Sequence, residues 1–289
     1  MQHDVGLLEP LRPVNSPSWR GALTLCWREW IRFFRQRNRV IGAIGQPILF
    51  WLLFGAGMNQ VFRVEGQGFS EYYFPGTMLL ILLFTAIFAT ISIIEDRREG
   101  FLQSVLVAPI PRWSVVLGKV LGGSLIAVAQ GLVFLVLALT LGIRLSPLTV
   151  ATIGLWLLVT SLGLTAMGCR LAWPMQSTQG FHAIMNLLLM PMWLLSGAFF
   201  PVPRLAADGS WVQVLMHWVM RVNPVTYAVA GLRQLLYADM PSVSFEASQL
   251  QDIWIPRLST CWIVVTLFGA VMFYLACRAA RENTSGDLL

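Results

Sequence analysis

A short charged segment followed by an apolar stripe is the part of the sequence best suited to bind another molecule. It opens with five consecutive charged residues, Glu95-Asp96-Arg97-Arg98-Glu99, followed by Gly100. Apolar side chains then recur at the spacing of one helical face, namely at Phe101, Leu102, Val105, Leu106 and Ala108, until Pro109 and Pro111 end the helix. We predict an amphipathic helix over 95–111 whose apolar side docks into a groove on a partner outside the lipid bilayer. A helix lying flat on lipid without a partner is the alternative.

The residues that could serve catalysis do not converge. The three histidines, His3, His182 and His217, lie far apart in the sequence. The carboxylates of the charged segment form a solvated face more readily than an acid/base pair. The nearest match to a phosphate-binding loop, Gly118-Lys119-Val120, lacks both the first glycine and the final hydroxyl residue. We therefore expect no catalytic residue in this chain and no ATP hydrolysis by the phosphate-binding-loop route. If the chain moves solutes actively, the energy must enter through a partner.

The cysteines give no sign of a metal site. They stand singly in or beside apolar runs, without Cys-x-x-Cys spacing and without a histidine at ligand spacing; they are Cys26, Cys169, Cys261 and Cys277. Such cysteines are typical of small buried apolar residues. We expect no metal and no cofactor bound by this chain.

The composition indicates a membrane protein. Of the 289 residues, 56% are hydrophobic and only 12% are charged, which excludes an ordinary soluble protein. The expected fold is an all-α polytopic membrane protein. The net charge of +6 is then explained by arginines on the cytoplasmic side of the membrane. No basic tract interleaved with aromatic residues stands apart from this pattern, so we expect no nucleic acid partner.

The region before the first apolar run has the features of a helix in the plane of the membrane surface. Residues 1–16 form a loose cytoplasmic tail in this interpretation, and Ser16-Pro17 starts the helix. Over 17–39, aromatic residues fall on one face and arginines on the other; the residues that define the two faces are Trp19, Trp27, Trp30, Arg32 and Arg35. An interfacial amphipathic helix is therefore predicted, with a soluble amphipathic helix as the alternative.

The rest of the chain reads as one transmembrane domain, 40–281, followed by a tail over 282–289. Six apolar runs are long enough to cross a core of ~30 Å; they cover about 40–58, 72–94, 113–143, 147–169, 181–200 and 258–277. Lys119 lies near the start of the third run and is expected to reach the cytoplasmic headgroups, because a charge at the centre of the bilayer is costly. A catalytic or ion-relay lysine is the alternative, but no carboxylate within the spans is available to pair with it.

Two short helices are predicted between the fifth and sixth spans, over 208–237. Trp211 begins an apolar stripe, and Asn223-Pro224 separates it from a second run that includes Tyr227. Arginines and Asn223 would otherwise lie at membrane depth, so helices half sunk in the outer leaflet fit better than another span.

The distribution of basic residues predicts the orientation. Fourteen of the twenty Lys and Arg residues fall on the side of the membrane that holds both termini and the 95–111 segment. Because basic residues accumulate on the cytoplasmic side, both termini and this segment are expected to be cytoplasmic.

Two motifs of the sequence, in the order in which they occur, resemble those of a known family. Glu95-Asp96-Arg97-Arg98-Glu99-Gly100 runs into Leu106-Val107-Ala108-Pro109-Ile110-Pro111-Arg112 and Leu117-Gly118-Lys119, and Asn223-Pro224-Val225-Thr226-Tyr227-Ala228-Val229 precedes Gly231-Leu232-Arg233. Over about 19–281, the chain is similar to the membrane subunits of type-2 ABC exporters, especially the antibiotic-resistance and nodulation-factor export branch.

The resemblance implies a function for several segments. The 95–111 segment would be the coupling helix that docks on a separate ATPase subunit, and the 208–237 helices would cap the transport path. The assembly would contain two ABC-type ATPase subunits, which hold ATP and Mg, and two membrane subunits, either two copies of this chain or one copy and a sibling. The protein would lie in the plasma membrane, the inner membrane of a bacterium.

The substrate expected from the resemblance is amphipathic or lipid-like: a drug, a lipid or a lipo-oligosaccharide. By analogy the path lies between the second and fifth spans; its possible residues are Gln46, Phe84, Phe88, Met185, Asn186, Met192 and Trp193. Gln46 and Asn186 could equally join helices to one another. A scaffold or assembly factor that does not transport, and a polytopic membrane enzyme, remain as alternatives.

Overall fold

The computed structural model describes residues 18–58, 63–64, 67–108, 110–143, 145–204, 210–238 and 253–282. The predicted tail 1–16, and all of the predicted tail 282–289 except Glu282, lie outside these ranges. Helices dominate the described part, with one short antiparallel pair formed by β1 (Arg63–Val64) and β2 (Gln67–Gly68). The predicted all-α polytopic membrane fold is confirmed.

Within the described residues, five helices are long and apolar enough to cross a membrane. They are α3 (Phe69–Ala89) continued by α4 (Ile91–Arg98), α6 (Arg112–Leu135) continued by the 3-10 helix η1 (Val136–Leu141), α7 (Pro147–Ala172), α8 (Thr178–Trp193) continued by the π-helix η2 (Leu194–Ala198), and α11 (Leu258–Glu282). The predicted first span lies in α2 (Arg37–Met58), whose apolar part, Val40–Gly55, is shorter than these five. The count of six spans therefore stays a prediction.

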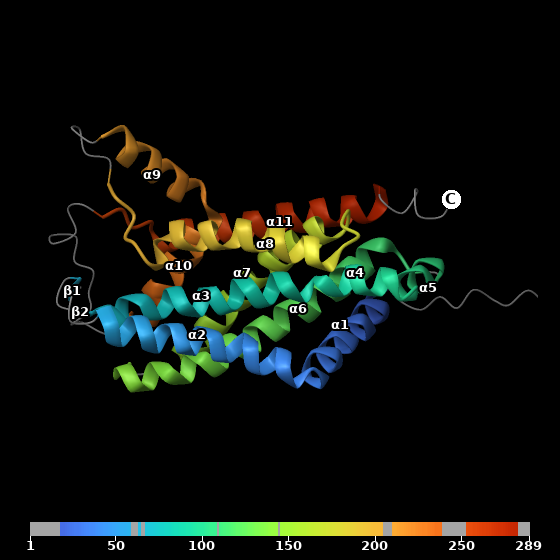
Figure 1. The fold of residues 1–289 in the computed structure, drawn as a ribbon, viewed down its shortest axis with the longest axis horizontal. Coiled ribbons are helices and arrows are strands. Elements are labelled where there is room, and N and C mark those ends of the chain that lie inside the picture. The colour runs from blue at the N-terminus through green and yellow to red at the C-terminus, as the bar shows by residue number, and fades with distance from the viewer. Residues whose placement is uncertain are drawn as a thin grey trace, which may run out of the picture.

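The long helices run side by side, and the shorter ones gather at the two ends of the molecule (Figure 1). α1 (Ser18–Arg35), α4 and α5 (Phe101–Val107) lie at the same end as the C-terminal end of α11. β1, β2, α9 (Trp211–Val222) and α10 (Pro224–Leu236) lie at the opposite end. The two helices predicted within 208–237 are thus α9 and α10, while 208 and 209 lie outside the described residues.

α3 forms the centre of the bundle. It is apolar all round, and most of its side chains between Tyr72 and Ile87 are buried by neighbouring helices. A helix that is hydrophobic on every side is expected in such a central position. α4, which continues α3, therefore places the charged residues Glu95–Arg98 at the end of the packed bundle.

The segment 95–111 is not one helix, which corrects the prediction from sequence. α4 ends at Arg98, and Gly100 adopts a left-handed conformation with φ of 75° before α5 begins at Phe101. Glycine has no Cβ and adopts this conformation at little cost, so it turns the chain between the two helices. The charged residues thus extend the second span, and only Phe101–Val107 forms the separate helix.

Candidate functional site

Six ionisable side chains meet where α1, α4 and α6 come together. We call them the charge cluster; they are Arg28, Glu29 and Arg32 on α1, Glu95 and Asp96 on α4, and Lys119 on α6. Lys119 Nζ donates to Glu29 Oε1 at 2.6 Å, to Ser92 Oγ at 3.1 Å and to the Asp96 carboxylate. Lys119 and Asp96 are fully enclosed, with side chains 3% and 0% exposed.

Two arginines of α1 complete the cluster. Arg28 donates to both Asp96 carboxylate oxygens, at 2.9 and 2.7 Å. Arg32 bridges the neighbouring carboxylates, donating to Asp96 Oδ1 at 2.9 Å and to Glu95 Oε2 at 2.8 Å. The hydrogen bond to Asp96 raises the pKa of the Arg28 guanidinium above its ordinary value. Three cations thus face three carboxylates, and no formal charge within the cluster is left uncompensated.

Two glycines on α6 explain why α1 comes close enough to Lys119. A Cβ added to Gly118 would lie 2.7 Å from the Ala22 carbonyl oxygen, and one added to Gly122 would lie 2.7 Å from Glu29 Cβ. Small residues four positions apart let two helix backbones approach closely. Since Lys119 follows Gly118 directly, this approach brings its side chain to Glu29.

The cluster overturns the expectation for Lys119. Its ammonium group does not reach the headgroups, because Asp96 comes from the extension of the second span and Glu29 from α1. Asp96 is likewise buried and not part of a solvated face. A signal for Glu29 was present in the sequence, since it falls in register with Ala22, Cys26 and Phe33 on the buried side of α1.

α1 covers only Ser18–Arg35 of the helix predicted over 17–39, because α2 begins at Arg37, and its faces are used differently. Arg28 and Arg32 turn inward to the cluster, while Trp19 and Trp27 point away from the bundle and are exposed. Trp30 is half-buried and packs against Phe34 with ring centroids 4.9 Å apart. Arg35 is exposed. The exposed tryptophans leave an aromatic surface on α1 that is suited to a membrane interface.

α5 is attached to the charge cluster through an aromatic contact. The Arg28 guanidinium lies over the Phe101 ring, 3.8 Å from its centroid. Such a cation–π contact is worth ~0.5–2 kcal/mol, depending on how far water is excluded. Glu99, at the turn between α4 and α5, lies 3.6 Å from Arg32. Movement of α5 would therefore act on Arg28, and movement of the turn before α5 would act on Arg32.

The apolar stripe predicted to bind a partner faces the protein itself. Leu102 is buried, and Phe101 and Val105 are half-buried against the core. The outward side of α5 carries Gln103, Ser104 and Val107. Pro109 and the side chain of Leu106 lie outside what the structure describes. Any partner that binds α5 in this arrangement meets its polar side and Val107, which is 80% exposed.

The arginines between Asp96 and Glu99 hold the connection between α7 and α8. Arg97 donates to the carbonyls of Trp173 and Met175, at 2.6 and 3.2 Å. Arg98, predicted to contact a partner, donates through Nε to the Gln176 carbonyl at 3.1 Å. The turn that precedes α5 is thereby connected to α7 and α8 as well as to α1 and α6.

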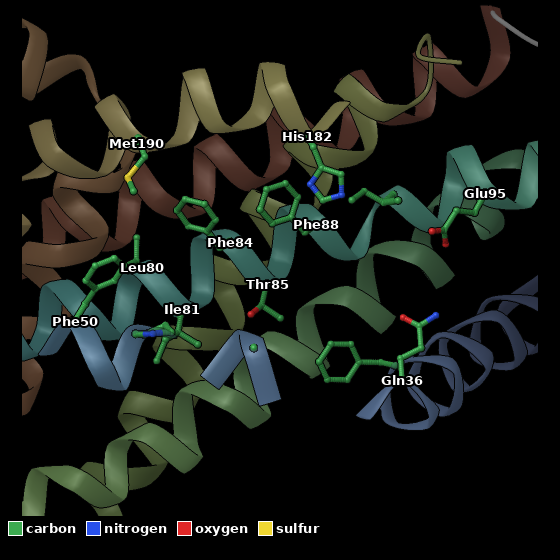
Figure 2. A pocket seen from close by; sticks show the side chains of 14 residues that line it. Gln36, Phe50, Leu80, Ile81, Phe84, Thr85, Phe88, Glu95, His182 and Met190 are labelled. Carbon is green, nitrogen blue, oxygen red and sulfur yellow. The ribbon is translucent and has the colours of Figure 1, made fainter. Parts of the chain in front are cut away.

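A cavity of about 450 Å³ lies between α2, α3 and α8 and reaches Glu95 at one end (Figure 2). Of the predicted path residues, Phe84 and Phe88 line it. Met185 and Trp193 are buried elsewhere, Met192 is half-buried and Asn186 is exposed on α8. The side chain of Gln46 lies outside the described residues, although Pro47 beside it does line the cavity.

The predicted outer residues hold α10 against the end of α8. Asn223 Nδ2 donates to the carbonyls of Met192 and Leu195, at 2.6 and 3.1 Å, and its Oδ1 accepts from Val225 N at the start of α10. Pro224 takes the first position of that helix. Tyr227 is buried with its ring 5.8 Å from that of Trp254, while Trp211 is exposed on α9.

Among the described residues, no group of three or more His, Cys, Asp or Glu side chains could hold a metal ion. The cluster carboxylates are instead engaged by Arg and Lys side chains. These ion pairs connect α1, α4 and α6 to one another.

Comparison with known proteins identifies the family. The family model described as ABC-2 type transporter matches residues 21–237. The chain belongs to the ABC-2 type transporter family. It is 27% identical over 256 residues to a chain named as the transport permease ycf38 of Cyanophora paradoxa, covering 86% of this chain and 84% of the relative. It is also 23% identical over 275 residues to the inner membrane transport permease YadH of Escherichia coli K12, covering 93% and 97%.

The family match identifies the general function of this ABC-2 permease. Members of the family are transmembrane transporter subunits that work with an ABC ATPase partner. The matched range contains the whole charge cluster, α5, the cavity-lining helices and the Asn223 contacts. The resemblance noted from the sequence motifs is therefore confirmed at the level of the family, and the export branch stays a prediction.

Proposed function

We propose that this permease subunit exports an amphipathic or lipid-like substrate, driven by a separate ATPase that binds at α5. The supporting observation is the Arg28–Phe101 contact, which attaches α5 to the buried charge cluster. α5 lies at the end of the bundle, next to α4 (Figure 1). Its exposed side offers Gln103, Ser104 and Val107 to a partner.

Through the charge cluster, a force applied to α5 would be transmitted to other helices. A push on α5 would be carried by Arg28 to Asp96 at the end of the α3–α4 helix, and from Asp96 to Lys119 on α6. Because these charges are buried and compensate one another, separating them without replacement would be costly. The helices should therefore move together, and Gly100 supplies the turn about which α5 is oriented.

The proposal includes the orientation and the assembly. The end that carries α1, α5 and the C-terminal end of α11 would face the cytoplasm, in agreement with the excess of arginines there. Two permease subunits, identical or sibling, would assemble with two ATPase subunits in the plasma membrane, and in a bacterium this is the inner membrane. The scaffold and enzyme alternatives lack a comparable observation in their favour.

Purification of the tagged permease in mild detergent tests the proposal. An ABC ATPase should be recovered in equal amount, and its ATP hydrolysis should be faster in the complex than alone. Val107→Asp, on the exposed side of α5, should abolish recovery of the ATPase while the permease remains in the membrane. Val222→Asp, at a valine that is 78% exposed at the end of α9 and lies outside every predicted span, is the matched control. A permease recovered alone, or an ATPase retained equally by both variants, would contradict the proposal.

A further inference from the structure

The walls of the cavity indicate which ligands it accepts. α3 and α4 contribute one helical stripe, in which Leu80, Phe84, Phe88, Ile91 and Glu95 follow one another at intervals of three or four residues. Phe33 and Phe50 approach from α1 and α2. A volume of about 450 Å³ falls within the range of sites for small organic molecules, ~300–1,000 Å³. The cavity is therefore lined by four phenylalanines together with other apolar side chains, and Glu95 lies at one end of it.

The described lining of the cavity carries a negative charge and no side chain of Arg or Lys. Among the described residues that line the cavity, Glu95 is the carboxylate, and neither Arg nor Lys is present. Its side chain is 32% exposed, so part of it faces open space. The faces of the phenylalanine rings carry partial negative charge and attract cations. Among the described lining residues, an organic anion would meet a carboxylate and the ring faces, and no basic side chain to balance it.

We propose that this cavity binds amphiphilic organic cations, with the apolar body against the phenylalanines and the cationic group beside Glu95. This inference rests on the proposed function, because it names the substrate class of the transporter. The partly aromatic wall accommodates the body of the ligand, and Glu95 distinguishes a cation from an anion of the same shape. His182, whose ring lies 4.9 Å from that of Phe88, adds a polar group on the α8 side.

Glu95 also connects the cavity to the charge cluster. Its Oε2 accepts from Arg32 Nη2 at 2.8 Å, and the same arginine donates to Asp96 and lies 3.6 Å from Glu99. A cation beside Glu95 would share this carboxylate with Arg32. Arg32 retains Asp96 as a hydrogen-bond partner, so its guanidinium stays paired when a ligand shares Glu95. Binding in the cavity would therefore change the contacts of a residue that adjoins the turn before α5.

A pair of nearly isosteric ions provides the test. The full-length permease in nanodiscs of zwitterionic lipid is dialysed to equilibrium against tetraphenylphosphonium or tetraphenylborate, with empty nanodiscs as the blank. We expect saturable binding of the cation above the blank and none of the anion. Glu95→Gln should weaken binding of the cation by about tenfold, since one ionic contact is lost. Glu95→Asp should retain most of the affinity.

Glu99→Gln is the matched control. Glu99 also lies beside Arg32, but it does not line the cavity and its side chain is 60% exposed. This variant should bind the cation as the wild type does. Equal binding of both ions, absence of saturable binding of the cation, or the same affinity in Glu95→Gln as in the wild type would overturn the proposal.

A second variant keeps the test decisive if Glu95→Gln fails to fold. Gly42 lines the cavity, and a Cβ added there would meet no atom within 4 Å. Gly42→Leu should therefore fill part of the cavity and reduce cation binding without lowering the melting temperature, whereas unchanged binding would contradict the proposed site. The ATPase is absent from this assay, so failure of cation binding and failure of ATPase recovery are observed separately.

Discussion

Lys119 Nζ lies 2.6 Å from Glu29 Oε1 and joins α6 to α1 inside the protein. The two residues are 90 positions apart in the chain, and both are buried. A buried lysine in a membrane protein is stable only where its charge is compensated. This contact, together with Asp96, fixes the helix that carries the exposed tryptophans to the helix that follows α5.

Lys119→Met should strongly destabilise the permease. Removal of one partner from a buried ionic group costs about 3–5 kcal/mol, because the remaining charges lose their compensation. Thermal unfolding in detergent measures the effect, and Lys119→Met combined with Glu29→Gln should recover part of the loss. Arg278→Ala, which breaks an exposed pair with Glu282, is the control and should change nothing measurable. Equal melting temperatures for Lys119→Met and the control would show that the cluster does not stabilise the fold.

Gly100→Ala should alter the orientation of α5. A side chain at φ of 75° costs about 1–2 kcal/mol, so the turn between α4 and α5 would shift toward another conformation. We expect normal amounts of protein in the membrane and weaker stimulation of the ATPase partner. Gly45→Ala is the control, since Gly45 lies within α2 and an added Cβ there meets no atom within 4 Å. Full stimulation by Gly100→Ala would show that this turn does not orient α5.

Asn223→Ala should loosen α10 from the end of α8. The variant loses the cap of α10 and leaves two carbonyl groups without this donor, at an expected cost of about 1–3 kcal/mol. Asn223→Asp separates the two effects, because aspartate caps the helix but cannot donate to Met192 and Leu195. We expect thermal unfolding to show an intermediate loss for Asn223→Asp. If this variant is as stable as the wild type, the bonds to the π-helical end of α8 contribute nothing.

Gly231→Ala should clash with Trp156. A Cβ at this position would overlap Trp156 Cζ2 and lie 2.6 Å from Cη2, while the indole is held by a hydrogen bond of 3.0 Å to the Ala228 carbonyl. Such overpacking costs about 1–3 kcal/mol and should lower the melting temperature. Gly154→Ala, where the nearest atom is 4.0 Å away, should be tolerated. Equal melting temperatures in the two variants would refute the close packing of α7 against α10.

The sequence was sufficient to predict the class of fold and the positions of most helices. Hydrophobic runs located the long helices, and Asn223-Pro224 located the boundary between α9 and α10. The break at Gly100 was missed because a glycine within an amphipathic pattern does not reveal its own φ. Element boundaries therefore depended on backbone conformations that periodicity does not encode.

The charge cluster could not be derived from the sequence because it joins three separate segments. Glu29, Asp96 and Lys119 each lie on a recognisable helix, but helical periodicity gives the face of a residue and not its partner on another helix. Tertiary packing also changed which side of α1 contacts the rest of the protein, because Arg28 and Arg32 turn inward. The cavity likewise combines α2, α3 and α8, and of its described lining residues only Phe84 and Phe88 on α3 were predicted.

Cross-linking from α5 is the most direct test of the central claim that this helix binds the ATPase. A photoreactive benzophenone side chain is placed at Val107, and in a matched variant at Leu139, an exposed position near the opposite end of the molecule. Irradiation of membranes that contain both proteins should produce a covalent permease–ATPase product from position 107 and none from position 139. Cross-linking to the ATPase only from position 139, or from neither position while the complex remains intact, would contradict the account.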